Sequence, residues 1–124
     1  MHNAALDFTS LSNEELAEQF AELSLNEFDA ELGSENKRMN RLARATIAIT
    51  RVLRSRGPEA LRLLLPLLDH QNAQVRLNGA RAVMSVERER AIATLQDLHR
   101  RGPGAQRGAS GMSLYHLESG IWKP

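Results

Sequence analysis

The chain has 124 residues and a mass of 13.8 kDa, with 42% hydrophobic residues, 25% charged residues and no cysteine. This size suits one domain with its own core, and the lack of cysteine excludes a disulfide framework, thiolate zinc sites and a cysteine nucleophile. The net charge of +1 divides unevenly, since residues 1–36 hold nine acids and no Lys or Arg, whereas residues 37–124 hold sixteen Lys and Arg against six acids, a balance of +10. Either the acidic segment folds against the basic body, or the basic surface meets an acidic partner.

No apolar run is long enough for a bilayer, because the longest one, residues 63–68, falls far short of the roughly 18 to 20 residues required. The start of the chain lacks the basic and apolar regions of a secretory signal. We therefore expect a cytoplasmic protein with no membrane partner and a flexible N-terminus over residues 1–11.

Residues 12–33 form an acidic segment that is predicted to be helical. Ser12 and Glu15 have the spacing of a capping box, and Leu16, Phe20 and Leu23 recur on one helical face. After Leu23 the apolar phase slips, so we expect a kink or break near residues 24–26 and an end at Gly33.

Residues 34–56 are predicted to form a long second helix that is capped by Ser34. Its apolar residues fall within one arc, and four cations share the other side of the helix. We call these four cations the Arg ridge: Lys37, Arg41, Arg44 and Arg51. Gly57 ends this helix and Pro58 begins the next one.

Residues 58–69 form a Leu-rich segment with Pro66 inside it, which predicts a bent helix that is buried on more than one side. Asn72 is a good N-cap for a helix over residues 73–86. Small residues in that helix, Gly79 among them, let another helix approach closely.

A fifth helix over residues 87–101 and a last one over residues 103–118 complete the pattern. The last helix should bury Met112, Leu117 and either Leu114 or Tyr115. No segment alternates with period two, and no hairpin turn joins apolar runs. The sequence therefore predicts an all-α domain of five to six helices.

The stretch from residue 61 to residue 83 resembles a HEAT repeat. The features that carry the resemblance are an internal proline, an Asn in the turn, a Val-Arg pair and close-packing alanines: Pro66, Asn72, Val75, Arg76, Ala80 and Ala82. The resemblance implies a short right-handed α-solenoid, since one repeat cannot bury its own face. The HEAT-like repeat would span about 58–86 within central helices over 34–101, and residues 103–124 would form a C-terminal helix and tail of the same single domain, 1–124.

More narrowly, the whole chain resembles a small bacterial family of HEAT-like domains of unknown function. The stretches that carry this resemblance are Arg56–Ala60, the Leu-rich helix through His70, Val75–Asn78 and the ending Gly111–Pro124. That family implies no activity. HEAT-like proteins in general are scaffolds that bind proteins, and a minority bind nucleic acid.

No catalytic template is complete in this sequence. Residues 108–112 approach a nucleophile elbow but have Met in place of the last Gly, and residues 102–108 miss the spacing of GxGxxG. The four histidines are not paired at metal-ligand spacing. We expect no enzyme activity, no catalytic residue, no cofactor and no metal.

The sequence favours a protein-interaction module or adaptor, and neutralisation of a toxin is one role suggested by analogy. The candidate contacts are the Arg ridge (Lys37, Arg41, Arg44 and Arg51) together with Arg76 and Arg81. Arg76 could instead pair with an acid or a turn carbonyl, and Trp122 could be a plug over an apolar groove or an anchor for a partner. The alternative function is nucleic-acid binding through phosphate contacts by the Arg-rich body. The sequence does not decide whether the chain forms a homo-oligomer.

Overall fold

The computed structural model describes residues 7–124, and all regular elements in this range are helices. In chain order they are η1 (Phe8–Ser10), α1 (Asn13–Leu32), α2 (Asn36–Arg56), α3 (Pro58–Leu61), η2 (Arg62–Asp69), α4 (Ala73–Val83), α5 (Arg88–Arg101) and α6 (Gly104–Ser119), where η denotes a 3-10 helix. They form a single compact domain, and the all-α prediction is confirmed for these residues. Within residues 7–124 no helix has the length and apolarity needed to cross a membrane.

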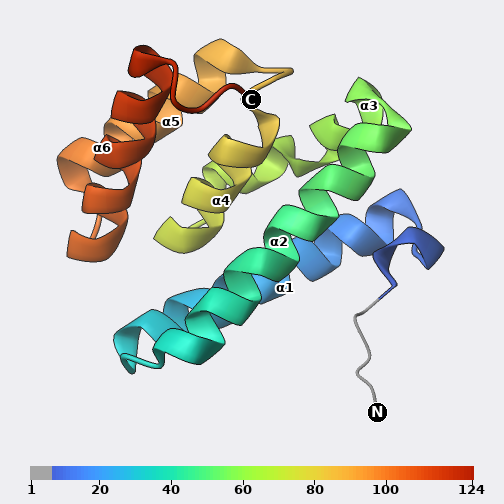
Figure 1. Ribbon diagram of the computed structural model, residues 1–124, viewed down its shortest axis with the longest axis horizontal. Coiled ribbons are helices and arrows are strands. Elements are labelled where there is room, and N and C mark those ends of the chain that lie inside the picture. Colours follow the sequence, from blue (N-terminus) through green and yellow to red (C-terminus); the bar gives the residue numbers. More distant parts are fainter. Residues whose placement is uncertain (1–6) are drawn as a thin grey trace.

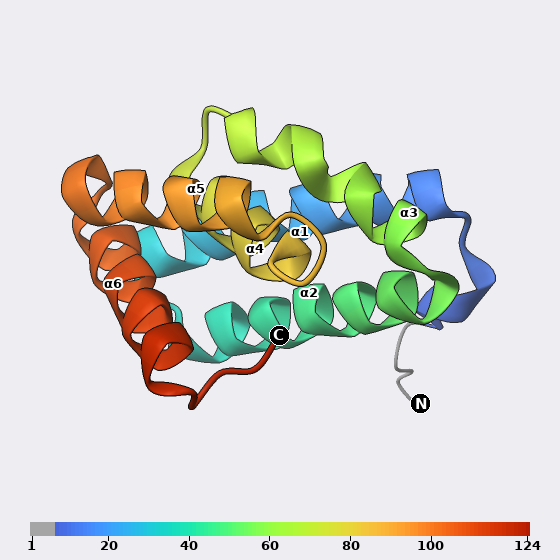
Figure 2. The same ribbon diagram turned by 90° about the horizontal axis from the view of Figure 1, so that it is seen from above.

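The helices are arranged around α4. The long helices α1 and α2 pack side by side, α5 and α6 form a second pair, and α4 lies between the two pairs (Figures 1 and 2). The 3-10 helix η2 packs along α4 and also reaches α1. This arrangement brings α2, α4 and α6 around one region of the surface.

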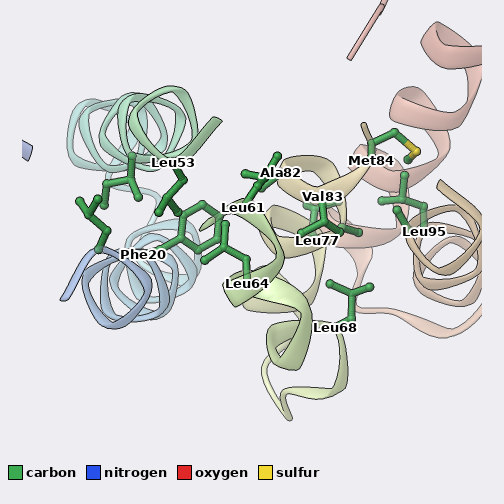
Figure 3. Close-up of a cluster of buried hydrophobic side chains, with 14 of the residues drawn as sticks. Phe20, Leu53, Leu61, Leu64, Leu68, Leu77, Ala82, Val83, Met84 and Leu95 are labelled. Carbon is green, nitrogen blue, oxygen red and sulfur yellow. The ribbon is translucent and has the colours of Figure 1, made fainter. Parts of the chain in front are cut away.

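The hydrophobic core runs through all of these contacts. Phe20 of α1 and Leu53 of α2 meet Leu61 and Leu64, while side chains of α4 continue the core toward Leu95 of α5 (Figure 3). Each of these five side chains is at most 1% exposed. Burial of a side chain of this size stabilises a fold by about 1.5–3 kcal/mol, so the core fixes the relative positions of the helices.

Several helix ends lie where the sequence predicts them. The Ser12 hydroxyl accepts a hydrogen bond from the Glu15 backbone at 3.1 Å, and the Glu15 carboxylate accepts one from the Ser12 backbone at 2.9 Å. Asn72 accepts bonds from two backbone N–H groups of α4. Gly57 has a φ of 115°, which favours glycine, and it separates α2 from Pro58 at the start of α3.

The predicted break in the first helix is wrong, because α1 runs continuously from Asn13 to Leu32. The buried face continues through Ser24, Glu27 and Ala30, whereas Leu25 is 41% exposed. The apolar pattern changes phase because the inner face becomes polar there, and hydrogen bonds from α4 satisfy those polar groups.

The prediction of a flexible N-terminus fails for the part of it that the structure describes. Phe8 is 8% exposed in η1, which packs against α2. The Arg56 guanidinium donates to the backbone oxygens of Leu11 at 2.8 Å and Thr9 at 3.0 Å. Residues 1–6 lie outside the described residues.

The predicted cap of the second helix is also wrong. Ser34 has a positive φ of 56° and precedes the N-cap position, which Glu35 occupies without a side-chain capping bond. The predicted helix over 58–69 is a four-residue α3 followed by the 3-10 helix η2, with Pro66 inside the latter. The helix predicted over 73–86 ends earlier, at Val83.

The buried face of α6 differs from the prediction. Gln106, Ser110 and Ser113 are buried, while Met112 and Tyr115 are exposed; Leu114 and Leu117 do pack partly against the core. Small residues allow α6 to approach α5 closely, because a Cβ atom at Gly111 would lie 2.7 Å from the His99 ring. The remaining buried face of α6 is polar, and it bonds to α4 through Gln106 and Ser113.

Candidate functional site

A cleft of about 500 Å³ opens between α2 on one side and α4, α6 and the C-terminal tail on the other. Figure 2 shows the tail returning from the end of α6 toward α2. The lining residues come from α1, α2, α4, α6 and the tail: Phe20, Glu27, Ala43, Thr46, Ile47, Thr50, Arg51, Arg54, Asn78, Arg81, Ala82, Ser113, His116 and Trp122. We call this feature the α2–α6 cleft.

Three arginines and one glutamate give the cleft its charge. Arg51 and Arg54 are exposed on α2, and Arg81 is half-buried on α4. Arg81 Nε donates to Ser113 Oγ of α6 at 2.9 Å, and no carboxylate of residues 7–124 forms an ion pair with it. Burial lowers the pKa of Arg81, and the charge of Glu27 opposes that shift. Since arginine remains cationic in proteins, the cleft is a positively charged recess.

A buried polar network lies beneath the cleft. The two carboxylate oxygens of Glu27 accept hydrogen bonds from Gln74 Nε2 at 3.1 Å and from Asn78 Nδ2 at 2.9 Å. Asn78 also donates to Ser24 Oγ at 2.9 Å, and Gln106 Nε2 donates to Gln74 Oε1 at 2.9 Å. The network joins α1, α4 and α6, so it holds the floor and one wall of the cleft in a fixed relation.

Glu27 is 8% exposed, and its burial has an electrostatic consequence. Desolvation raises the pKa of Glu27, while the hydrogen bond from Asn78 and the charge of Arg81 lower it, with the desolvation effect larger. Both carboxylate oxygens are already occupied as acceptors. These two hydrogen bonds therefore fix the Glu27 side chain in the floor of the cleft.

Apolar side chains border the charged part of the cleft. Ile47 of α2 is 50% exposed. Trp122 is half-buried, packs partly against the core and lines the cleft, and its backbone N–H donates to the His116 oxygen at 3.0 Å. Trp122 therefore both packs against the core, as a plug would, and lines the cleft; its role as an anchor for a partner stays a prediction.

The four residues of the Arg ridge are all exposed on α2. Although α1 packs beside α2, no ion pair in residues 7–124 joins an acid of α1 to the ridge. Of the four, Arg51 lines the cleft, whereas Lys37, Arg41 and Arg44 do not. The α1–α2 contact therefore leaves the ridge without internal ion pairs to α1.

Arg76 lies apart from the cleft. Its Nη1 donates to the backbone oxygens of His70 and Gln71, each at 2.8 Å, in the turn between η2 and α4. Of the two roles expected for Arg76, the structure shows the contact with turn carbonyls. Arg81, in contrast, lines the cleft together with Arg51.

Sequence reasoning missed Arg54, Glu27 and Asn78 as cleft residues. The change of phase after Leu23 was the available signal for Glu27, because the helical continuation of the buried face falls on it. No group of three or more His, Asp or Glu side chains in residues 7–124 is arranged to hold a metal ion.

Comparison with known proteins agrees with this helical architecture. No curated protein matches the chain. The crystal structure of the protein RPA1889 from Rhodopseudomonas palustris CGA009 is similar, with a TM-score of 0.90 and 31% sequence identity over 97% of this chain and 99% of that one. A family model described as a domain of unknown function, DUF2019, matches residues 14–118. The chain therefore belongs to the DUF2019 family of domains of unknown function.

Proposed function

We propose that this protein is a non-enzymatic interaction module of HEAT-like design that binds an acidic partner protein in the cytoplasm. The observation that carries the proposal is the α2–α6 cleft, where Arg51, Arg54 and Arg81 adjoin the apolar side chains of Ile47 and Trp122. Cationic and apolar groups that converge in a recess suit the recognition of another protein.

The helix pair η2–α4 supports the HEAT-like part of the proposal. Pro66 lies inside its first helix, Asn72 caps its second, and Arg76 braces the turn between them. A Cβ atom at Gly79 would lie 3.1 Å from Leu67 Cβ, so the two helices are in close contact. The pair α5–α6 would then be the neighbouring repeat of a short solenoid.

The charge distribution favours a protein over a nucleic acid as the partner. Exposed acids of α1, including Glu14, Glu18 and Glu22, lie on the helix next to α2. A nucleic-acid backbone that follows α2 would pass close to these carboxylates and would be repelled by them. A short acidic protein segment needs to enter only the cleft, whose lining holds three arginines and one carboxylate.

Site-specific photo-crosslinking in the native host tests the proposal. A benzoyl-phenylalanine at position 47 faces the cleft, whereas the same group at Leu32, which is 66% exposed at the end of α1, serves as the control. We expect a discrete protein adduct from position 47 that weakens when Arg51 and Arg54 are replaced by Glu. No adduct above the Leu32 control would refute the proposal, and an adduct with nucleic acid would establish the alternative function. The identity of the adduct also tests whether the partner is a toxin.

A further inference from the structure

We infer that the α2–α6 cleft binds a carboxylate side chain, flanked by apolar residues, in an acidic segment of the partner protein. This inference rests on the proposed function and specifies the chemistry that the cleft recognises. Three features of the cleft carry it: the donors that Arg81 has left over, the charge around them and the apolar border.

Arg81 is the anchor for the carboxylate. Its Nε and Nη2 atoms are used in bonds to Ser113 Oγ and, at 3.4 Å, to the Ala109 oxygen, which hold the guanidinium plane against α6. Its Nη1 atom forms no hydrogen bond with residues 7–124 and is accessible to solvent, and the Arg81 side chain lines the cleft. A fixed, partly desolvated guanidinium with unused N–H groups is a suitable donor for a carboxylate.

The cleft's own carboxylate, Glu27, does not occupy the position at Arg81 that we assign to the partner's carboxylate. Glu27 is held in the floor by its bonds to Gln74 and Asn78. With Glu27 ionised, the three arginines among the lining residues still leave an excess of two positive charges. Charges act more strongly in a recess than on an open surface, because the protein walls reduce the local dielectric constant. An anion that enters the cleft is therefore attracted from both walls.

The apolar border specifies what accompanies the carboxylate. Ile47 and Trp122 stand beside the charged groups, and Phe20, Ala43 and Ala82 contribute further apolar lining. A volume of about 500 Å³ lies within the range of about 300–1,000 Å³ that is typical of ligand sites. A short peptide segment with acidic and apolar residues satisfies both parts of the lining, whereas a phosphodiester backbone satisfies the cations alone.

The protein carries its own reporter for this inference, since Trp122 is the single tryptophan of the chain. We would titrate the full chain with the blocked peptide acetyl-Leu-Glu-Leu-Asp-Leu-amide and with its twin, in which Gln and Asn replace the two acids, and follow tryptophan fluorescence. We expect a saturable change with the acidic peptide, an affinity that falls as salt is added, and binding of the amide twin that is weaker by about tenfold or more.

The double variant R51Q/R54Q tests the cleft, because both arginines are exposed and their removal leaves the core intact. It should weaken the acidic peptide by about tenfold or more. The matched control is R88Q/R100Q, which removes the same charge from exposed positions on α5 and should leave affinity within about twofold. A third variant, R81K, keeps the charge and removes the planar fork, and it should also weaken binding.

Equal binding of the two peptides, or equal effects of the cleft variant and the α5 variant, would overturn the inference. Either result leaves the crosslink from position 47 as a separate measure of the proposed function, so the two failures are distinguishable. The oligomeric state of the peptide-free protein, measured by sedimentation, is the last test. A dimer that R51Q/R54Q abolishes and R88Q/R100Q preserves would show that a second copy occupies the cleft and would also overturn the inference.

Discussion

Arg76→Met should lower the free energy of unfolding by about 1–2 kcal/mol. The guanidinium makes two bonds of 2.8 Å to the carbonyls of His70 and Gln71, and such bonds contribute about 0.5–1.5 kcal/mol each. The arginine is half-buried, so solvent compensates part of the loss. Methionine keeps the apolar stem of the side chain, which limits the change to the lost hydrogen bonds.

The matched control for this experiment is Arg44→Met on α2. Arg44 is exposed and belongs to the Arg ridge, and its replacement should change stability by less than about 0.5 kcal/mol. Urea unfolding followed by circular dichroism measures both variants, and the unchanged m-value of each would show that the unfolded states are comparable.

The same pair of variants separates a structural role of Arg76 from a binding role. If Arg76→Met is no less stable than Arg44→Met, the brace on the turn contributes nothing and the reasoning is refuted. If Arg76→Met keeps its stability but loses the crosslink from position 47, Arg76 is a partner contact. We expect the opposite pattern, with reduced stability and an intact crosslink.

Three further predictions concern the fold. Gly102→Ala should lower the free energy of unfolding, measured with urea, by about 1–3 kcal/mol, because its Cβ atom would lie 2.6 Å from the Leu98 backbone oxygen. Gly108→Ala, whose Cβ atom would have no neighbour within 4 Å, should raise it by up to about 1 kcal/mol through helix propensity. Since folding raises the pKa of Glu27, the native state binds its proton more tightly than the unfolded state, so the stability of wild type relative to E27Q should fall as the pH rises above the ordinary pKa of 4.5; a difference that does not vary with pH would contradict this. Phe8→Ala should cost about 3 kcal/mol by the same unfolding assay, and an unchanged midpoint would show that η1 is not docked in solution.

The features that the sequence predicted correctly depend on neighbouring residues. Ser12 with Glu15, Asn72 with the first turn of α4, and Gly57 with Pro58 all act over a separation of three residues or fewer. Local hydrogen bonds and backbone preferences favour such helix ends before any tertiary contact forms. Their positions can therefore be inferred without knowledge of the fold.

The features that the sequence did not predict depend on distant partners. Ser24 and Glu27 break the apolar pattern of α1, and their burial is explained only by Asn78, which lies 54 and 51 residues further along the chain. The buried polar face of α6 depends in the same way on α4, because Gln106 bonds to Gln74 and Ser113 accepts a hydrogen bond from Arg81. Apolar periodicity identifies a buried face only where that face is apolar, so the polar network under the cleft could not be predicted from it.

The structure bears on whether the acidic N-terminal segment neutralises the basic body of the chain or leaves its cations open to a partner. The acids of α1 make no ion pairs with the Arg ridge in residues 7–124, and the one carboxylate of α1 that is buried, Glu27, acts on Arg81. Packed helices lie about 8–10 Å apart, which is close to the Debye length of about 8 Å in physiological salt. Salt therefore screens part of the attraction between the exposed acids of α1 and the cations of α2. The lining of the cleft includes Phe20 and Glu27 of α1, and its three arginines outnumber its one carboxylate. For the acidic partner segment that we propose, this excess of positive charge would favour approach to the cleft.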